Sequence, residues 1–306
     1  MKAKTNILII GGTGFIGYHF AKKCLTKGWQ IASISSRKPK KTRYLPRVKY
    51  IICDITKKRS LKQKVRKSFN YVVNLGGYVD HSNKKKTFES HYVGCKNLAE
   101  IFIKKMPTTF IQMGSSVEYG NSSSPQKESV KCSLKSIKSI YGKAKLLSSR
   151  YMIDLYKKKN FPSVVLRLYL AYGPKQDMNR FLPIIIDGCI KNKKFPCSTG
   201  NQLRDFIHVD DVVDAIIKSL KNKNAKGQII NIGSGKPGKI KDIINHVKKI
   251  SKGGFPQFGK IKLRKDEILK IYPSIKKAKN KINWKPKISF RKGLKSTIKF
   301  YNEKTI

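Results

Sequence analysis

The sequence is poor in acidic residues, in arginine and in long apolar runs. Only 17 of its 306 residues are aspartate or glutamate, against 68 lysines and arginines, which gives a formal net charge of +51. A strongly basic chain is the usual footprint of a nucleic-acid-binding protein. However, only 11 of the basic residues are arginine, the side chain best suited to forked contacts with phosphates and bases, and the lysines are spread along the whole chain. We therefore expect a compositional bias rather than a nucleic-acid partner.

Metal-binding patterns and membrane spans are also missing from the sequence. The six cysteines are scattered, none forms a C-x-x-C pair and no histidine cluster accompanies them, so we expect no metal site. Single cysteines are typical of a reducing compartment, and we expect a cytoplasmic protein. The apolar run at 7–10 is too short for the core of a signal peptide. No stretch approaches the ~18 apolar residues of a membrane-spanning helix.

Short apolar strands alternate with helices in the first half of the chain. The predicted strands are apolar on both faces, as in a buried parallel sheet, and they cover 6–10, 30–35, 49–53, 71–75, 109–113 and 163–168. The predicted helices cover 15–27, 60–68, 84–105 and 137–159. This rhythm predicts a doubly wound α/β fold. The second half has shorter predicted elements, namely helices at 181–191 and 210–220, a segment at 204–209, a strand at 228–232 and two more helices in the tail.

A glycine-rich turn follows the first predicted strand and opens the first helix. Its sequence is Gly11-Gly12-Thr13-Gly14-Phe15-Ile16-Gly17. Glycines allow a tight turn, close approach of the backbone to a pyrophosphate and close packing of helix on strand, while the free N–H groups of the helix bind the pyrophosphate. The position between a strand and a helix distinguishes a dinucleotide-binding turn from an ordinary one. We predict cofactor contacts from Gly11, Thr13, Gly14, Phe15, Ile16 and Gly17.

The spacing of these glycines resembles that of the extended short-chain dehydrogenase/reductases, the NAD(P)-dependent family of nucleotide-sugar epimerases and dehydratases. The resemblance extends over nearly the whole chain. It implies a Rossmann-type doubly wound parallel sheet in an NAD(P)-binding domain at residues 1–173. It also implies a smaller C-terminal α/β substrate-binding lobe, mainly residues 174–306, with part of 204–235 packing back on the first domain. A homodimer formed through the helices at 84–105 and 137–159 is a further implication.

The end of the second predicted strand bears on the choice between NAD(H) and NADP(H). An acidic residue there would bind the ribose 2′-hydroxyl, whereas a basic one accommodates a 2′-phosphate. The sequence has Ser35-Ser36-Arg37-Lys38 and no carboxylate, which favours NADP(H), with NAD(H) as the alternative. With the positions that the resemblance adds, further cofactor contacts are predicted for Ser36, Arg37, Asp54, Ile55, Leu75 and Gly76.

A tyrosine and a lysine stand four residues apart in a predicted helix, so Tyr141 and Lys145 share one helical face. An ammonium beside a phenol stabilises the phenolate, and the tyrosine can then exchange a proton with a sugar hydroxyl or ketone. The segment after the fifth strand, Gly114-Ser115-Ser116-Val117-Glu118, resembles the serine-bearing segment of the family. The resemblance therefore implies a catalytic set of Ser115, Tyr141 and Lys145, and the last two also contact the cofactor.

The residues after Ser115 bear on the reaction. Dehydratases of the family have an acidic pair there, where this chain has Ser116 and Val117. Glu118 is one position too late, and its side chain should point elsewhere on an extended backbone. Val117 also replaces the cysteine that some reductase-epimerases need. The reaction that remains is hydride transfer at C4 of a nucleotide-diphosphate sugar. It would be catalysed either by a 4-epimerase or by a reductase of a 4-keto-6-deoxy sugar.

The second half resembles the family in the run from Arg204 to Asp211. Arg204 matches the arginine that binds the nucleotide diphosphate, for which a planar fork of donors is suited. Asp210 and Asp211 precede an apolar helix and are predicted to cap it. Two asparagines common in the family are replaced, by His91 and Leu170. Substrate contacts are predicted for Ser116, Arg180, Arg204 and Arg264.

Two other classes of function stay open at this point. A non-catalytic dinucleotide-binding protein, such as a redox sensor or an assembly factor, would need the glycine turn but not the Ser115–Tyr141–Lys145 set. A nucleic-acid-binding protein would bind DNA with an affinity that falls steeply with salt and does not depend on Arg204.

Overall fold

The computed structural model describes residues 4–263 and 267–303. Its largest sheet has seven strands in the order β11-β6-β5-β4-β1-β2-β3, and all neighbouring strands are parallel. The strands are β1 Asn6–Ile10, β2 Gln30–Ser35, β3 Val48–Ile52, β4 Tyr71–Asn74, β5 Thr109–Ser115, β6 Ser163–Leu168 and β11 Ile229–Ile232. The predicted Rossmann-type α/β fold is confirmed.

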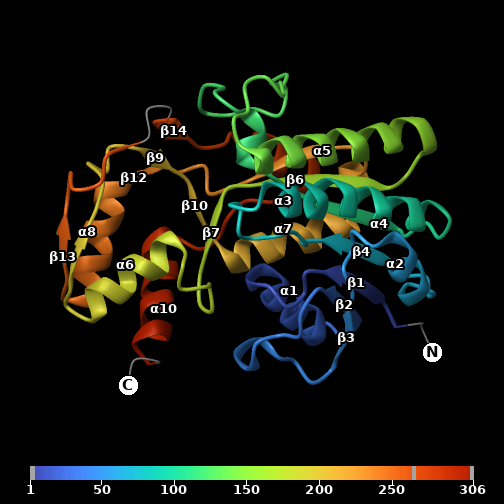
Figure 1. Ribbon diagram of the computed structural model, residues 1–306, viewed down its shortest axis with the longest axis horizontal. Coiled ribbons are helices and arrows are strands. Elements are labelled where there is room, and N and C mark those ends of the chain that lie inside the picture. The colour runs from blue at the N-terminus through green and yellow to red at the C-terminus, as the bar shows by residue number, and fades with distance from the viewer. Residues whose placement is uncertain (1–3, 264–266, 304–306) are drawn as a thin grey trace.

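Helices cover both faces of this sheet (Figure 1). The apolar side chains of β1 show why, because Ile7 and Ile9 enter one core while Leu8 and Ile10 enter the other. The first core is closed by α1 Phe15–Thr26, α7 Val209–Lys221 and α9 Lys276–Ile282. The second core is closed by α2 Lys58–Lys64, α4 Gly94–Ile103 and α5 Ile140–Lys159.

A third core lies beside the carboxyl end of the main sheet, at the left of Figure 1. It is formed mainly by α6 Phe181–Ile190, α8 Ile240–Ser251 and α10 Phe290–Asn302. Short strands surround it, namely β7 Leu170–Tyr172, β8 Lys194–Pro196, β9 Leu203–Arg204, β10 Phe206–His208, β12 Gly238–Lys239, β13 Phe255–Gln257 and β14 Lys270–Ile271. The chain returns from these elements to the main sheet at β11, which pairs with β6. A domain boundary at residues 173 and 174 stays a prediction.

Several predicted helices have different limits in the structure. The helix predicted at 84–105 is α3 Lys84–Phe88, a π-helical turn Glu89–Val93 and then α4. The long helix α5 begins at Ile140 rather than at residue 137, because the Ser139 hydroxyl caps it by accepting the Gly142 N–H at 3.1 Å. Within residues 233–263 and 267–303 the tail has three helices rather than the predicted two, since the seven-residue α9 buries its apolar side chains against the first core.

The prediction that Asp210 and Asp211 cap α7 was wrong. The helix begins at Val209, so both aspartates lie in its first turn, and the cap is His208, whose ring accepts the Asp210 N–H at 3.3 Å. The Asp211 carboxylate is buried and accepts the N–H groups of Lys287 and Ile288 at 2.9 and 3.0 Å. This aspartate therefore attaches the segment before α10 to the main sheet's helix layer.

Candidate active site

The residues predicted to bind the cofactor lie at one edge of the main sheet. The strands β3, β2, β1 and β4 are parallel neighbours, so the turns that follow them meet at their carboxyl ends, where open α/β sheets bind ligands. The turn after β1 is held there because the Gly11 N–H donates to the Ile34 carbonyl at 2.7 Å. It also touches the turn after β4, since a Cβ on Gly11 would lie 3.0 Å from the Gly76 Cα. The residues assembled at this edge are Gly11, Thr13, Gly14, Phe15, Ile16, Gly17, Ser36, Arg37, Asp54, Ile55, Leu75 and Gly76.

The start of α1 has the features of an anion site. A Cβ on Gly17 would lie 2.2 Å from the Gly11 carbonyl oxygen, so the helix can approach the turn this closely only with glycine there. Gly14 is the N-cap of the helix, and it offers no side-chain acceptor to the first N–H groups. These groups are free to bind a negatively charged phosphate at the positive end of the helix. The turn therefore fits the pyrophosphate of a dinucleotide.

The three residues predicted to be catalytic come together where β5 ends and α5 begins. Ser115 is the last residue of β5, and Tyr141 lies in the first turn of α5. The buried Lys145 Nζ donates to the Met113 carbonyl at 2.6 Å and lies 5.8 Å from the centre of the Tyr141 ring. The start of α5 packs directly on the turn after β5, since a Cβ on Gly142 would lie 3.3 Å from the carbonyl oxygen of Val117.

Two histidine rings contact the ring of Tyr141, and the sequence does not predict these contacts. The His81 ring stacks on the phenol ring with a centroid distance of 4.1 Å and an angle of 16°. The His91 ring meets the phenol edge-on at 4.9 Å. His81 is a single histidine in a loop, and no sequence pattern marks it. His91 stands out in the sequence only because it replaces an asparagine that is common in the family. The π-helical turn that carries it has no clear sequence signal.

The neutral form is favoured at both of these histidines, because their pKa values are lowered. Burial lowers the pKa of His91 to about 2, and the nearby Lys145 ammonium contributes in the same direction. Burial, Arg180 and Lys145 also lower the pKa of His81. The His91 Nε2 lies 3.2 Å from the carbonyl oxygen of Tyr78, which requires the proton on that nitrogen. Tyr141 therefore has uncharged rings at its face and edge and a lysine one turn further along α5.

The sequence predicts an extended backbone at Glu118. In the structure the strand ends before this residue, because residues Ser116–Tyr119 form a 3₁₀ turn. The Glu118 side chain is fully buried. One carboxylate oxygen accepts the Ser115 N–H at 2.8 Å, and the other accepts the Arg167 Nε at 2.8 Å. The glutamate is thus engaged within the fold, and sequence reasoning did not foresee its contact with Ser115.

The residues predicted to bind substrate are in different situations. Ser116 is nearly buried beside Ser115, and Arg180 is the N-cap residue of α6, close enough to His81 to affect its pKa. Arg204 donates to the Leu203 carbonyl at 2.9 Å and forms an ion pair with Glu267. Burial lowers the pKa of Arg204, and the Glu267 carboxylate opposes this. Arg264 lies outside the described residues.

Comparison with known proteins adds the decisive observation. Residues 7–233 match the model of the "NAD dependent epimerase/dehydratase family". The chain belongs to this family. The match confirms the family resemblance drawn from the glycine turn and the later motifs, and the family description supports NAD(H) as a cofactor.

Individual members of the family are distant from this chain. The UDP-N-acetyl-alpha-D-glucosaminuronate decarboxylase of Bacillus cytotoxicus is 24% identical over 322 residues, which cover 98% of this chain and 98% of that protein. The CDP-abequose synthase of Salmonella typhimurium is 34% identical over 143 residues, 44% of this chain and 47% of that one. A crystal structure of UDP-glucose 4-epimerase from Thermotoga maritima, with UDP-glucose, has a TM-score of 0.91, covers 99% of this chain and 100% of its own, and is 24% identical. This last similarity is one of fold.

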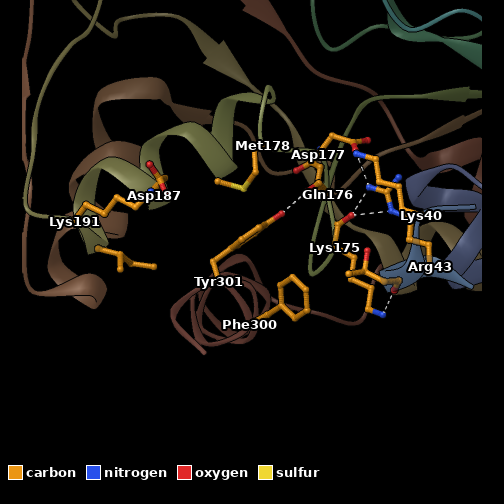
Figure 2. Close-up of a pocket in the computed structure, with 12 residues that line it drawn as sticks. Lys40, Arg43, Lys175, Gln176, Asp177, Met178, Asp187, Lys191, Phe300 and Tyr301 are labelled. Carbon is orange, nitrogen blue, oxygen red and sulfur yellow. Dashed lines mark hydrogen bonds and ion pairs between the residues drawn. The ribbon is translucent and has the colours of Figure 1, made fainter. Parts of the chain in front are cut away.

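A separate cavity of about 540 Å³ lies between the two parts of this family member (Figure 2). The loop after β2 meets the loop after β7 there, and Lys40 and Arg43 both reach Asp177, at 2.9 and 3.1 Å. Tyr301 from α10 donates to the Gln176 carbonyl at 2.5 Å. None of the predicted site residues lines this cavity, so we do not assign the chemistry to it.

Metal-binding clusters and membrane-spanning helices are both absent from the described part of the chain. Residues 4–263 and 267–303 contain no group of three or more histidine, cysteine, aspartate or glutamate side chains that could hold a metal ion. Over the same ranges, no helix is both long enough and apolar enough to pass through a membrane.

Proposed function

We propose that this family member transfers a hydride at C4 of a nucleotide-diphosphate sugar. The observation that carries the proposal is the meeting of Ser115, Tyr141 and Lys145 at the sheet edge that also carries the glycine turn. A proton-transfer group beside a dinucleotide site is what oxidation of a carbinol or reduction of a ketone requires. The family and its nucleotide-sugar members support the same substrate class.

In this proposal the side chains supply proton transfer and orientation. A bound nicotinamide supplies the hydride donor or acceptor. Tyr141 gives a proton to the sugar oxygen or takes one from it, and the Ser115 hydroxyl donates a hydrogen bond to the same oxygen. The Lys145 ammonium is fixed by the Met113 carbonyl and stabilises the phenolate. Holding the reacting groups in place lowers the entropic part of the barrier.

The nucleotide and sugar contacts in the proposal come mainly from the second part of the chain. Arg204 binds the diphosphate, with Arg264, Arg180 and Ser116 as further substrate contacts. Leu170 stands where the resemblance has an asparagine, and this residue is 44% exposed. An apolar side chain there, together with Ser36 and Arg37 after β2, favours an NADPH-dependent reductase of a 4-keto-6-deoxy sugar. The 4-epimerase is the other reaction of this class.

A screen of nucleotide sugars with NADPH and NADH tests the proposal. A reductase consumes one reduced cofactor per turnover, so the nicotinamide absorbance falls, whereas an epimerase converts the sugar with no net change. Tyr141→Phe is the control variant and should lower kcat by about 100-fold or more, because it removes the proton-transfer group. Activity that is unchanged in Tyr141→Phe would falsify the assignment of the site.

The assembly state and the partners are proposed on the resemblance and on composition. We expect a homodimer formed through the helices α3, α4 and α5, which sedimentation of the purified protein can test. We expect no specific DNA binding, and a salt-resistant complex with a defined DNA would contradict this.

A further inference from the structure

A buried ion pair lies directly behind Ser115. Glu118 and Arg167 have side chains that are 0% and 3% exposed, and their charged groups are 2.8 Å apart. Arg167 is in β6 opposite Gly114 of β5 in the parallel register, so the pair sits under the end of the strand that carries the serine. A buried ion pair by itself contributes little to stability, because desolvation offsets the attraction. Stability therefore does not explain why this ion pair lies behind Ser115.

The contacts of Glu118 provide a reason. Its two carboxylate oxygens have different partners, the Ser115 N–H at 2.8 Å and the Arg167 Nε at 2.8 Å. The serine and the glutamate form a capping box on the 3₁₀ turn, so the backbone of Ser115 is held to the side chain three residues later. Charged acceptors form stronger hydrogen bonds than neutral ones.

The surrounding residues hold Glu118 and Arg167 in one arrangement. The Arg167 guanidinium lies 4.5 Å from the centre of the Tyr119 ring, and the Tyr119 hydroxyl donates to the Asn231 side chain at 2.8 Å. Gly114 leaves the space for the carboxylate, since a Cβ there would lie 2.5 Å from the Glu118 Oε1. The serine is thus anchored to β6 and, through Asn231, to β11.

We propose that Glu118, held by Arg167, is a positioning residue that fixes the Ser115 hydroxyl for the reaction. It touches neither substrate nor cofactor, and it acts through the backbone of the serine. It therefore affects kcat and leaves the binding of cofactor and nucleotide nearly unchanged. The kinetic part of this inference rests on the proposed function, whereas the effect on the Ser115 backbone does not.

The main test is the double variant Glu118→Leu with Arg167→Met. Apolar replacement of both partners leaves no buried unpaired charge, and such replacements usually keep a fold intact. We expect a melting temperature near that of the wild type, kcat lower by about tenfold to 100-fold and a KM within about threefold, because small displacements of a reacting group cost this much. Amide hydrogen exchange at Ser115 should become faster.

Two single variants serve as comparisons. Glu118→Gln keeps an oxygen for the Ser115 N–H, so it should retain more kcat and slower exchange at Ser115 than the double variant. Asp211→Asn is the matched control, because Asp211 is also a buried carboxylate that accepts backbone N–H groups, those of Lys287 and Ile288 at 2.9 and 3.0 Å, away from the serine. It should leave kcat and the Ser115 exchange unchanged.

The outcomes separate this inference from the proposed function. Wild-type kcat and wild-type exchange at Ser115 in the double variant would overturn the positioning role. Equal losses of kcat in the double variant and in Asp211→Asn would also overturn it, as they indicate a general effect on the fold. If no nucleotide sugar is turned over by the wild type, the proposed function fails, and the exchange measurements still decide whether Glu118 fixes Ser115.

Discussion

The environment of Tyr141 depends on side chains that are far apart in the sequence. His81 comes from the loop after β4 and His91 from the π-helical turn before α4, while the tyrosine itself begins α5. Aromatic contacts of this kind contribute about 0.5–1.5 kcal/mol each beyond the burial of their area. They restrict the phenol ring to one orientation, which is what proton transfer to a fixed sugar oxygen requires.

Replacing His81 tests whether the stacked ring orients the tyrosine. In His81→Ala the phenol loses its stacking partner, and we expect kcat to fall by about threefold to tenfold, the factor that corresponds to such an aromatic contact. His81→Phe keeps a flat ring without the titratable nitrogen and should retain most of the activity. Steady-state kinetics of both variants give the answer, and equal activity of His81→Ala and wild type would contradict the role.

At the scale of elements, the loop after β2 is attached to the loop after β7 by one carboxylate. Asp177 accepts both Lys40 and the buried Arg43, and Arg43 also donates to the Lys175 carbonyl at 3.2 Å (Figure 2). The first loop follows the predicted cofactor residues Ser36 and Arg37, and the second leads to α6. The two parts of the molecule are therefore joined beside the cofactor edge.

Asp177→Asn should weaken this attachment. The substitution leaves the buried Arg43 without a carboxylate partner. Because Asp177 is about one-third exposed, we expect the free energy of unfolding to fall by about 1–2 kcal/mol, less than the full cost of breaking a buried pair. Urea denaturation measures the free energy of unfolding. The control is Asp187→Asn, which removes a surface pair with Lys191 one helical turn away and should cost less than about 0.5 kcal/mol.

At the scale of the whole molecule, protonation of the histidines whose pKa is lowered by folding should decide how stability depends on pH. The pKa values of His19, His81, His91 and His208 are all lowered, with burial as the largest cause. Below the unfolded pKa of about 6.5 the unfolded chain binds more protons than the folded one, so stability falls as the pH decreases.

His91 has the largest effect in this group, because its folded pKa is about 2. At about pH 5 it alone should cost about 2 kcal/mol relative to pH above 7. Thermal unfolding from about pH 7.5 to 5 measures the effect, and His91→Asn should show a weaker pH dependence. A melting temperature that rises as the pH falls would contradict the prediction.

The net charge should make the molecule sensitive to salt. With +51 the folded chain repels itself, and salt shortens the Debye length from about 30 Å at 0.01 M to about 8 Å at 0.15 M. We expect the melting temperature to rise over this range. A flat or falling melting temperature would show instead that local ion pairs, which salt weakens, dominate the electrostatics.

The parallel sheet and the order of its first six strands along the chain were predictable, because strands buried on both faces are short apolar runs. Boundaries of β1, β2 and β6 agree with the prediction. Helix limits were less predictable. The break at Glu89–Val93 and the start of α5 at Ile140 depend on packing and on a cap rather than on periodicity.

By itself, the sequence determined the family, the fold and the glycine turn, because these depend on local patterns whose residues are neighbours in the chain. It also placed Tyr141 and Lys145 on one helical face. Only the tertiary structure brought His81 and His91 to the phenol, Glu118 and Arg167 behind Ser115, and Glu267 to Arg204. The reason is physical, since each of these contacts joins side chains from different elements or depends on a turn whose shape is set by packing.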